Sequence, residues 1–376
     1  MTQAFRLHVL GIPHTQTTQA FTGCAFTQKV HKFLRMMSGR GHEIFHYGHT
    51  QTDWSYPDVE HVPVVTEQDH RQAYGADYVD SELWRERGFA AYYDVDDHAH
   101  KTFHANAIKE IAARKQPYDI VLHFWGWGHK PIADALPDLI NIEPGIGYPG
   151  AWARWRVYES HAVMNALAGP SAVAHCEQNW YHRVIPNYFD ADDFTYSNIK
   201  DNYILFLGRI GRNKGVDIAI DACERAGKQL VIAGQGSLAD VGYTRTPDHV
   251  TMLGYADTAQ RRDIMSRAQG LFIASTYLEP FAGVQVEAWL SGTPVISPDW
   301  AAFAEMNLHG VTGYRCHNMR EFVQAVNRVG DLDNSQCRSH GEQYLLEHVA
   351  PQYESYFQDV MSVYTGAGWY EMKVHK

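Results

Sequence analysis

Segments with the pattern of strands alternate with segments with the pattern of helices through most of this chain. One series begins with a predicted strand at residues 7–12 and a second with a predicted strand at residues 203–207. Alternation of this kind favours parallel sheets, because a helix returns the chain between two parallel strands. The length of 376 residues favours two domains over one. The sequence therefore predicts an α/β protein with two Rossmann-like parallel-sheet domains that face each other across a cleft.

Residues 186–201 form a linker candidate, because Pro186 and Asn187 break the alternating pattern there. The predicted domains span residues 1–190 and 191–350. A last amphipathic segment within residues 351–376 predicts a helix that crosses back to the N-terminal domain. Residues 50–90 are polar, and we expect loops and short helices there.

Two glutamates, Glu279 and Glu287, are separated by seven residues. The first lies in a predicted loop with Pro and Gly, and the second opens an apolar run that predicts a helix. A Gly-Thr-Pro turn and a short predicted strand at residues 295–297 follow. Domains of this class bind ligands where strands end and helices begin. A carboxylate at each end of the loop can accept hydrogen bonds from two sets of hydroxyls, which suits a sugar or a ribose.

A Gly-rich segment at residues 207–215 lies between a predicted strand and a predicted helix. Glycines let a backbone approach a ligand, and a helix N-terminus favours negative charge. Arg209 and Lys214 add a guanidinium fork and a point charge, which together suit a diphosphate. The residue order is not that of a Walker A loop. The alternative is a turn whose Arg and Lys are simply solvated.

Taken together, these motifs resemble glycosyltransferase family 4, the retaining nucleotide-sugar-dependent enzymes of the GT-B fold. The matching order is Gly-Arg-(four residues)-Lys-Gly, then Glu-Pro-Phe-x-Gly-(three residues)-Glu-Ala, then Gly-Thr-Pro-Val. Further matching segments are residues 41–43, 184–190, 231–236, 253–255 and 310–314. The resemblance is specific in the C-terminal half and loose in the N-terminal half. It implies that residues 1–190 bind the acceptor and residues 191–350 the nucleotide sugar.

The resemblance also implies roles for single residues. Arg209 and Lys214 would bind the donor diphosphate and stabilise the departing phosphate, and Glu279 would bind hydroxyls of the transferred sugar. The other implied donor-binding residues are Glu287 at the ribose, Gly208, the backbone of Phe281, Ala282 and Gly283, Gly254 and Tyr255 near the base, and Gly23 from the other domain. The family commonly has Gly where this chain has Ala282, so one methyl group could change donor preference.

The catalytic histidine of the family maps only loosely onto residues 119–129. His123, at the end of a predicted strand, is expected to contact the transferred sugar or to orient the acceptor, with His129 as the other candidate. Most aromatic rings pack in cores, but a flat ring can also stack on the face of a sugar. The residues predicted to line the acceptor site are Trp125, Trp127, His129 and Tyr148.

The mechanism that the resemblance implies needs charge stabilisation more than a nucleophile. Negative charge develops on the β-phosphate, where two cations and helix N-termini would stabilise it. The acceptor would attack the face that the leaving group vacates, so configuration is retained. Residues 94–97 look like the metal-binding D-x-D of the other major glycosyltransferase fold, but a solvated loop is the favoured interpretation. We expect no metal and no cofactor beyond the nucleoside-diphosphate sugar itself.

The composition limits which partners the protein is expected to bind and which cellular compartment it suits. The formal charge of -11 argues against nonspecific nucleic-acid binding. The five cysteines are an odd number without a C-x-x-C pair, which favours a reduced, cytoplasmic protein. No run approaches the ~20 apolar residues of a membrane span, so membrane contact is expected to be peripheral at most. Lys29, Lys32 and Arg35 lie on one predicted helix, which either touches a lipid surface or packs on a sheet.

The predicted function is a retaining transferase that moves a hexose or deoxyhexose from a GDP- or UDP-sugar to a hydroxyl of a glycan or glycoconjugate. A GT-B phosphorylase would need a second phosphate site, and a DNA-base glycosyltransferase would need a basic groove. A non-catalytic sugar-nucleotide binder could keep the same four charged residues, Arg209, Lys214, Glu279 and Glu287. The sequence does not determine the donor base, the sugar, the acceptor or the oligomeric state.

Overall fold

The computed structural model describes residues 4–18, 21, 23–76, 94–169 and 180–364. The first of its two parallel sheets has the strand order β3-β2-β1-β4-β5-β6-β7. Its strands are β1 (Arg6–Leu10), β2 (Glu43–His49), β3 (Val59–Val65), β4 (Ile120–Leu122), β5 (Ile140–Ile146), β6 (Trp155–Tyr158) and β7 (Arg183–Val184). The helices of this half are α1 (Ala25–Met37), α2 (Glu67–Tyr74), α4 (His98–Arg114), α5 (Lys130–Ala135) and α6 (His161–Ala168).

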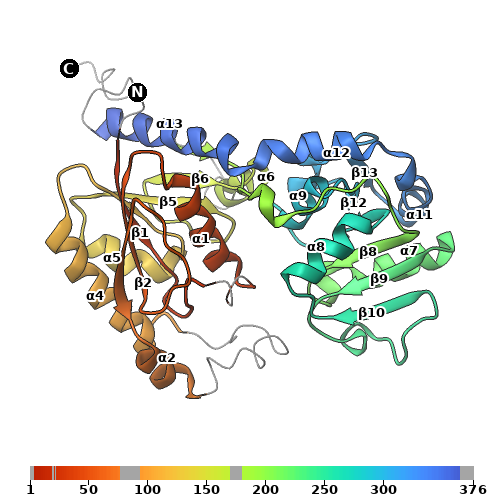
Figure 1. The fold of residues 1–376 in the computed structure, drawn as a ribbon, viewed down its shortest axis with the longest axis horizontal. Helices are drawn as coiled ribbons and strands as arrows, with labels where there is room; N and C mark the ends of the chain where they lie inside the picture. The colour runs from red at the N-terminus through yellow and green to blue at the C-terminus, as the bar shows by residue number, and fades with distance from the viewer. Residues whose placement is uncertain (1–3, 19–20, 22, 77–93, 170–179, 365–376) are drawn as a thin grey trace.

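The second sheet has the order β10-β9-β8-β11-β12-β13 (Figure 1). Its strands are β8 (Tyr203–Leu207), β9 (Gln229–Ala233), β10 (Val250–Gly254), β11 (Gly270–Phe272), β12 (Val295–Pro298) and β13 (Gly313–Cys316). Its helices are α7 (Val216–Ala226), α8 (Thr258–Arg267), α9 (Gly283–Leu290), α10 (Ala301–Met306), α11 (Met319–Arg328) and α12 (Asn334–Gly341), and α13 (Leu346–Tyr364) follows. The predicted α/β fold with two Rossmann-like parallel sheets is confirmed.

Two predicted segments differ from the structure. Within residues 50–90, strand β3 lies where we predicted loops, whereas the eight-residue helix α2 is one of the short helices predicted there. Strand β3 is the edge strand of its sheet, so it tolerates Pro63 and polar side chains that hide a strand pattern. The sequence pattern also predicts a helix at residues 158–167, but α6 begins at His161, because Ser160 Oγ caps it by accepting the Val163 N–H. The pattern at residues 172–176 predicts a strand, and these residues lie outside the described ranges.

The chain passes between the two sheets at two places that lie side by side. The Phe189 N–H donates to the Tyr344 carbonyl, and the Phe189 carbonyl accepts from Leu346 N–H, each at 2.9 Å. Helix α13 then runs back along the first sheet (Figure 1). Its Tyr353 and Phe357 are buried in the same core as strand β1 and helix α1. The predicted boundaries at residues 190 and 350 stay a prediction.

An ion pair fastens helix α13 to the first domain. The Arg40 guanidinium donates to both oxygens of Glu354, at 2.7 and 2.9 Å. His42 Nδ1 accepts the Phe5 N–H, so its Nε2–H is free to donate to Glu354 Oε1 at 3.2 Å. The hydrogen bond from Arg40 lowers the pKa of Glu354. The Glu354 side chain is 5% exposed, so it is the buried end of the pair.

Replacement of this carboxylate should weaken the fold. We expect Glu354→Gln to lower the free energy of unfolding by about 2 kcal/mol, less than for a fully buried pair because Arg40 is partly exposed. Urea unfolding measures the change. Glu347→Gln, on the exposed first turn of the same helix, is the control and should have almost no effect. Equal effects of the two substitutions would contradict this role for Glu354.

Buried neutral histidines line the inside of the first domain. His61 Nε2–H donates to the His49 carbonyl, so His61 Nδ1 must accept from His46 Nδ1–H at 3.0 Å. Burial lowers the pKa of His49 to about 4, of His123 to about 4, and of His14 to about 3. Protonation of these rings is therefore disfavoured in the folded protein.

The buried rings should make the fold sensitive to mild acid. Unfolded histidine takes up a proton near pH 6.5, whereas these folded rings stay neutral down to about pH 4. Each therefore removes about 1.4 kcal/mol of stability per pH unit as the pH falls between these values. Urea unfolding between about pH 7 and pH 5 should show this decline, with a shallower slope for His123→Asn. A flat profile would contradict it.

Candidate functional site

A cleft of about 670 Å³ lies between the carboxyl ends of the two sheets. The loops that follow strands β1, β5, β6, β8, β9, β10 and β11 all contribute to its walls. Ligands of doubly wound domains bind at this edge, because the loops after parallel strands meet there. The predicted donor-site residues in its lining are Gly23, Gly208, Arg209, Lys214, Tyr255, Glu279, Phe281, Ala282, Gly283 and Glu287. Gly254 ends β10 directly before Tyr255.

Glu279 is the centre of a hydrogen-bonded cluster in this cleft. Its Oε1 atom accepts from Ser275 Oγ at 2.9 Å, from the Tyr277 hydroxyl and from Lys214 Nζ. Its side chain is only 9% exposed. No described residue donates a hydrogen bond to its Oε2 atom, so this oxygen is left to accept from a ligand. Burial, with the nearby Glu279 carboxylate, raises the pKa of Tyr277, which stays a neutral donor.

The Gly-rich segment presents Arg209 to the cleft. The Gly208 N–H donates to the Ala233 carbonyl at 3.0 Å, which ties the loops after β8 and β9 together. A Cβ atom at Gly234 would lie 1.8 Å from the Gly208 oxygen, so this approach requires glycine. Arg209 is exposed and carries no hydrogen bond or ion pair within the described part of the chain. Its guanidinium is therefore available to an anion in the cleft.

Helix α9 begins earlier than predicted. Ala282 takes the left-handed conformation at a φ of 57° and precedes the first helical residue, Gly283. Glu287 therefore lies in the second turn and does not open the helix. Gly and Val are weak helix formers, which hides the first turn from the pattern. The first N–H groups of a helix lack intrahelical partners, and the cleft lies at this end of α9.

Glu287 on α9 forms an ion pair with a residue of the neighbouring helix α8. Its Oε2 atom lies 2.6 Å from Nη2 of Arg261 on α8, and its side chain is 14% exposed. The Glu287 carboxylate is the main cause that raises the pKa of Arg261. Arg261 could not be predicted as a site residue, because one arginine on a mostly polar helix carries no separate signal in the sequence.

The structure does not bring His123 into this cleft. The Asn141 amide nitrogen donates to two carbonyls, so its Oδ1 atom accepts from His123 Nε2–H at 2.8 Å. The His123 ring is fully buried, and burial lowers its pKa to about 4. His129 is also fully buried and is bonded through Nε2 to the Gly11 carbonyl at 2.9 Å. Both rings belong to the domain interior.

The three predicted aromatic walls also lie away from the cleft lining. Trp125 packs edge-on against Phe26, with ring centroids 4.8 Å apart. The Tyr148 hydroxyl donates to buried Glu143 at 3.0 Å, and Trp127 is 55% exposed beside the Lys130 ammonium. Trp125 and Trp127 lie at a short helix, Gly126–His129, that follows β4, and Tyr148 follows β5; none of the three lines the cleft.

Helix α1 and the loops after β5 and β6 supply the opposite wall instead. Lys29 pairs with Glu159 and donates to the Gly145 carbonyl at 2.9 Å. The Lys29 side chain is 11% exposed, and Lys32 is 8% exposed. Both face the cleft, so the lipid-surface interpretation of this helix is wrong for these two lysines. The sequence pattern shows that α1 has a charged face but cannot show what covers it.

The Asp-rich segment before α4 has a local role. Asp97 Oδ1 caps the helix by accepting the His100 N–H at 2.8 Å, and Asp94 accepts the Asp96 N–H at 3.0 Å. Over the described ranges, no group of three or more His, Cys, Asp or Glu side chains could hold a metal ion. Within the same ranges, no helix is both long and apolar enough to cross a membrane. Independence from metal stays a prediction.

The C-terminal sheet carries the similarity to known sequences. Residues 201–331 match the family described as "Glycosyl transferases group 1". An uncharacterized glycosyltransferase of Methanocaldococcus jannaschii is 34% identical over 122 residues. That match covers 30% of this chain and 31% of the relative, so the chain spans about a third of the length of this curated relative. The matched region contains Arg209, Lys214, Glu279 and Glu287.

Similarity to solved structures extends over nearly the whole chain. A glycosyltransferase involved in avilamycin A biosynthesis superposes with a TM-score of 0.64 at 17% identity, covering 95% of this chain and 98% of that one. An Anabaena protein, HepE, in complex with UDP and glucose gives a TM-score of 0.61 at 16% identity, covering 94% and 99%. At these identities the likeness shows the fold alone, which is the GT-B fold of these glycosyltransferases.

Proposed function

We propose that this protein is a retaining glycosyltransferase that moves a hexose or deoxyhexose from a UDP- or GDP-sugar to a hydroxyl of a glycan or glycoconjugate. The observation that supports this best is the convergence of Arg209, Lys214, Glu279 and Glu287 on one interdomain cleft. These four residues come from two separate segments of the chain, residues 209–214 and 279–287, and together they supply the cations and the acceptors that a nucleotide sugar requires. The match of residues 201–331 to group 1 glycosyltransferases supports the same activity.

In this proposal the donor lies along the C-terminal wall of the cleft. Its diphosphate binds between Arg209, Lys214 and the N-terminus of α9, where positive charge gathers. The transferred sugar donates hydroxyl hydrogen bonds to Glu279 Oε2, and the ribose binds Glu287 one helical turn along α9. The base lies toward Tyr255, which is 37% exposed. HepE was solved with UDP and glucose, which supports a donor of this chemistry.

Catalysis would come from charges that are in place before the donor binds. When the bond between sugar and phosphate breaks, negative charge grows on the β-phosphate. Arg209, which has no partner among the described residues, and the α9 N-terminus would stabilise this charge. Lys214 is held by Glu279 and Tyr277, so it is already positioned. These cations supply the charge that a metal would otherwise supply, and we propose a reaction without metal or cofactor.

The acceptor would enter from the N-terminal wall. A Cβ atom on Gly147 would lie 2.8 Å from Glu159 Oε2 and 3.0 Å from Pro280, so the two walls are close beside the Glu279 loop. Glu159 is 7% exposed and lines the cleft, which makes it a candidate to bind an acceptor hydroxyl. A cytoplasmic location with at most peripheral membrane contact is part of this proposal, and nucleic acid is not proposed as a partner.

A thermal-shift panel tests the donor site. We expect one of UDP, GDP, ADP, dTDP or CMP to raise the melting temperature, with UDP or GDP favoured. Glu287→Ala should reduce affinity for that nucleotide by about 10-fold or more, because a hydrogen bond to a charged group is lost. Glu224→Ala, on an exposed position of α7, is the matched control. If none of the nucleotides binds, the proposal fails.

Donor turnover separates an enzyme from a binder. We expect slow release of the nucleoside diphosphate from the preferred sugar nucleotide without acceptor, and the released sugar should keep the donor's anomeric configuration. Arg209→Met should slow this release by about 100-fold, because the charge that stabilises the departing phosphate is removed. Arg225→Met, on an exposed position of α7, serves as the control. Tight donor binding without any turnover would favour a non-catalytic sugar-nucleotide binder.

A further inference from the structure

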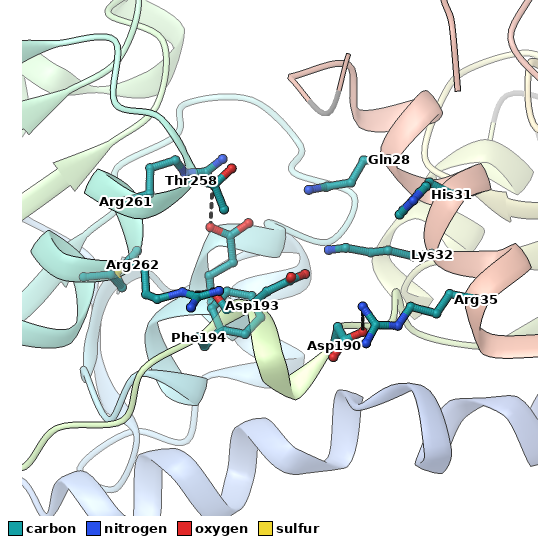
Figure 2. A pocket seen from close by; sticks show the side chains of 12 residues that line it. Gln28, His31, Lys32, Arg35, Asp190, Asp193, Phe194, Thr258, Arg261 and Arg262 are labelled. Carbon is teal, nitrogen blue, oxygen red and sulfur yellow. Dashed lines mark hydrogen bonds and ion pairs between the residues drawn. The ribbon is translucent and has the colours of Figure 1, made fainter. Parts of the chain in front are cut away.

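A second, smaller cavity of about 90 Å³ adjoins the main cleft between helices α1 and α8 (Figure 2). The linker residues Asp190, Asp193 and Phe194 form part of its wall. Four side chains line both spaces, namely Gln28 and Lys32 from α1, Arg261 from α8 and Glu287 from α9. The two spaces therefore meet at Glu287, and Lys32 reaches this junction from the opposite domain.

Among the described residues, Lys32 is the charged side chain at this junction that has no polar partner. It is 8% exposed, and its ammonium lies 4.4 Å from the centre of the Phe189 ring. Within the described part of the chain it makes no hydrogen bond and no ion pair. Figure 2 shows it extending from α1 into the space that faces Asp193. Burial lowers its pKa, although the Glu287 and Asp193 carboxylates oppose this effect.

The other cations of the smaller cavity are already engaged. Arg35 pairs with Asp190, and Arg261 pairs with Glu287. Arg262 donates to the carbonyls of Asp192 and Asp193, at 2.6 and 3.1 Å. Partial desolvation of an ammonium that has no protein acceptor costs free energy. Among the described residues that line this cavity, Lys32 carries the cation that is left to bind a ligand.

We propose that Lys32 binds the ribose of the donor from the N-terminal domain, opposite Glu287, and that it selects ribose over deoxyribose. This inference rests on the proposed function, which places the ribose at Glu287. A hydroxyl group both donates and accepts, so it can give its hydrogen to the Glu287 carboxylate while its oxygen accepts from the Lys32 ammonium. One pair of ribose hydroxyls would satisfy both charged groups at once.

The surroundings favour a neutral hydroxyl over an additional anion. Three carboxylates, Glu287, Asp190 and Asp193, line the smaller cavity and would repel a phosphate there. Two of them already neutralise arginines. A ribose bound between Lys32 and Glu287 would also link the two domains through the donor, because the two residues belong to different sheets.

Calorimetric affinities test this directly. Wild-type protein, Lys32→Met and Arg35→Met are titrated with UDP and GDP and with their 2′,3′-dideoxy analogues. We expect Lys32→Met to weaken binding of the ribonucleotide by about 10-fold and to leave the dideoxy analogue nearly unchanged. Arg35→Met, one turn along α1 and paired with Asp190, should change neither affinity. The ratio of the two affinities is a readout that a purely structural lysine would not alter.

The stability of the free protein gives a second readout. Methionine fills the same space without an unpaired charge, so Lys32→Met should raise the melting temperature in the absence of nucleotide. If Lys32→Met weakens both analogues equally, or neither, the inference is overturned while the proposed function stands. If wild-type protein binds neither UDP nor GDP, the proposed donor site itself fails.

Discussion

Parallel strand pairing is the constraint on which the rest of this structure depends. Because every strand of each sheet runs in one direction, the loops that follow the strands gather along one edge. The two edges face each other, and the cleft lies between them. Residues as distant in sequence as Lys29, Arg209 and Glu279 become neighbours for this reason alone. The helix that starts at each loop adds free N–H groups to the same space.

The free protein holds most of the cleft charges in pairs. Lys214 is paired with Glu279, and Arg261 with Glu287, while Lys29 is paired with Glu159. These pairs hold charged side chains in fixed positions, and such preorganisation is what electrostatic catalysis needs. Arg209 and Lys32 are different, because neither has an ion-pair partner among the described residues. They lie on opposite walls, so a donor that satisfies both must contact both domains.

The connections between the domains limit how these walls can move. The chain crosses at Phe189 and again at residues 344–346, and the two crossings are hydrogen-bonded to each other. Helix α13 carries the end of the chain back to the first core, where Glu354 binds Arg40. The Phe189 ring also packs between Lys32 and Phe281. One ring at the crossing therefore contacts a residue of each wall.

Local pattern by itself determined the class of fold and most of the donor wall. Strand β8 has the predicted bounds, and the four charged residues lie in the cleft, because strand–loop–helix units are encoded within about thirty neighbouring residues. Only the tertiary structure decided which residues form the N-terminal wall of the cleft. His123 and Trp125 resemble ligand-binding residues in sequence, yet His123 is buried and Trp125 packs half-buried against the core, whereas Lys32 looks like surface and is buried in the cleft. Burial depends on which segments pack together, and a linear pattern does not contain that information.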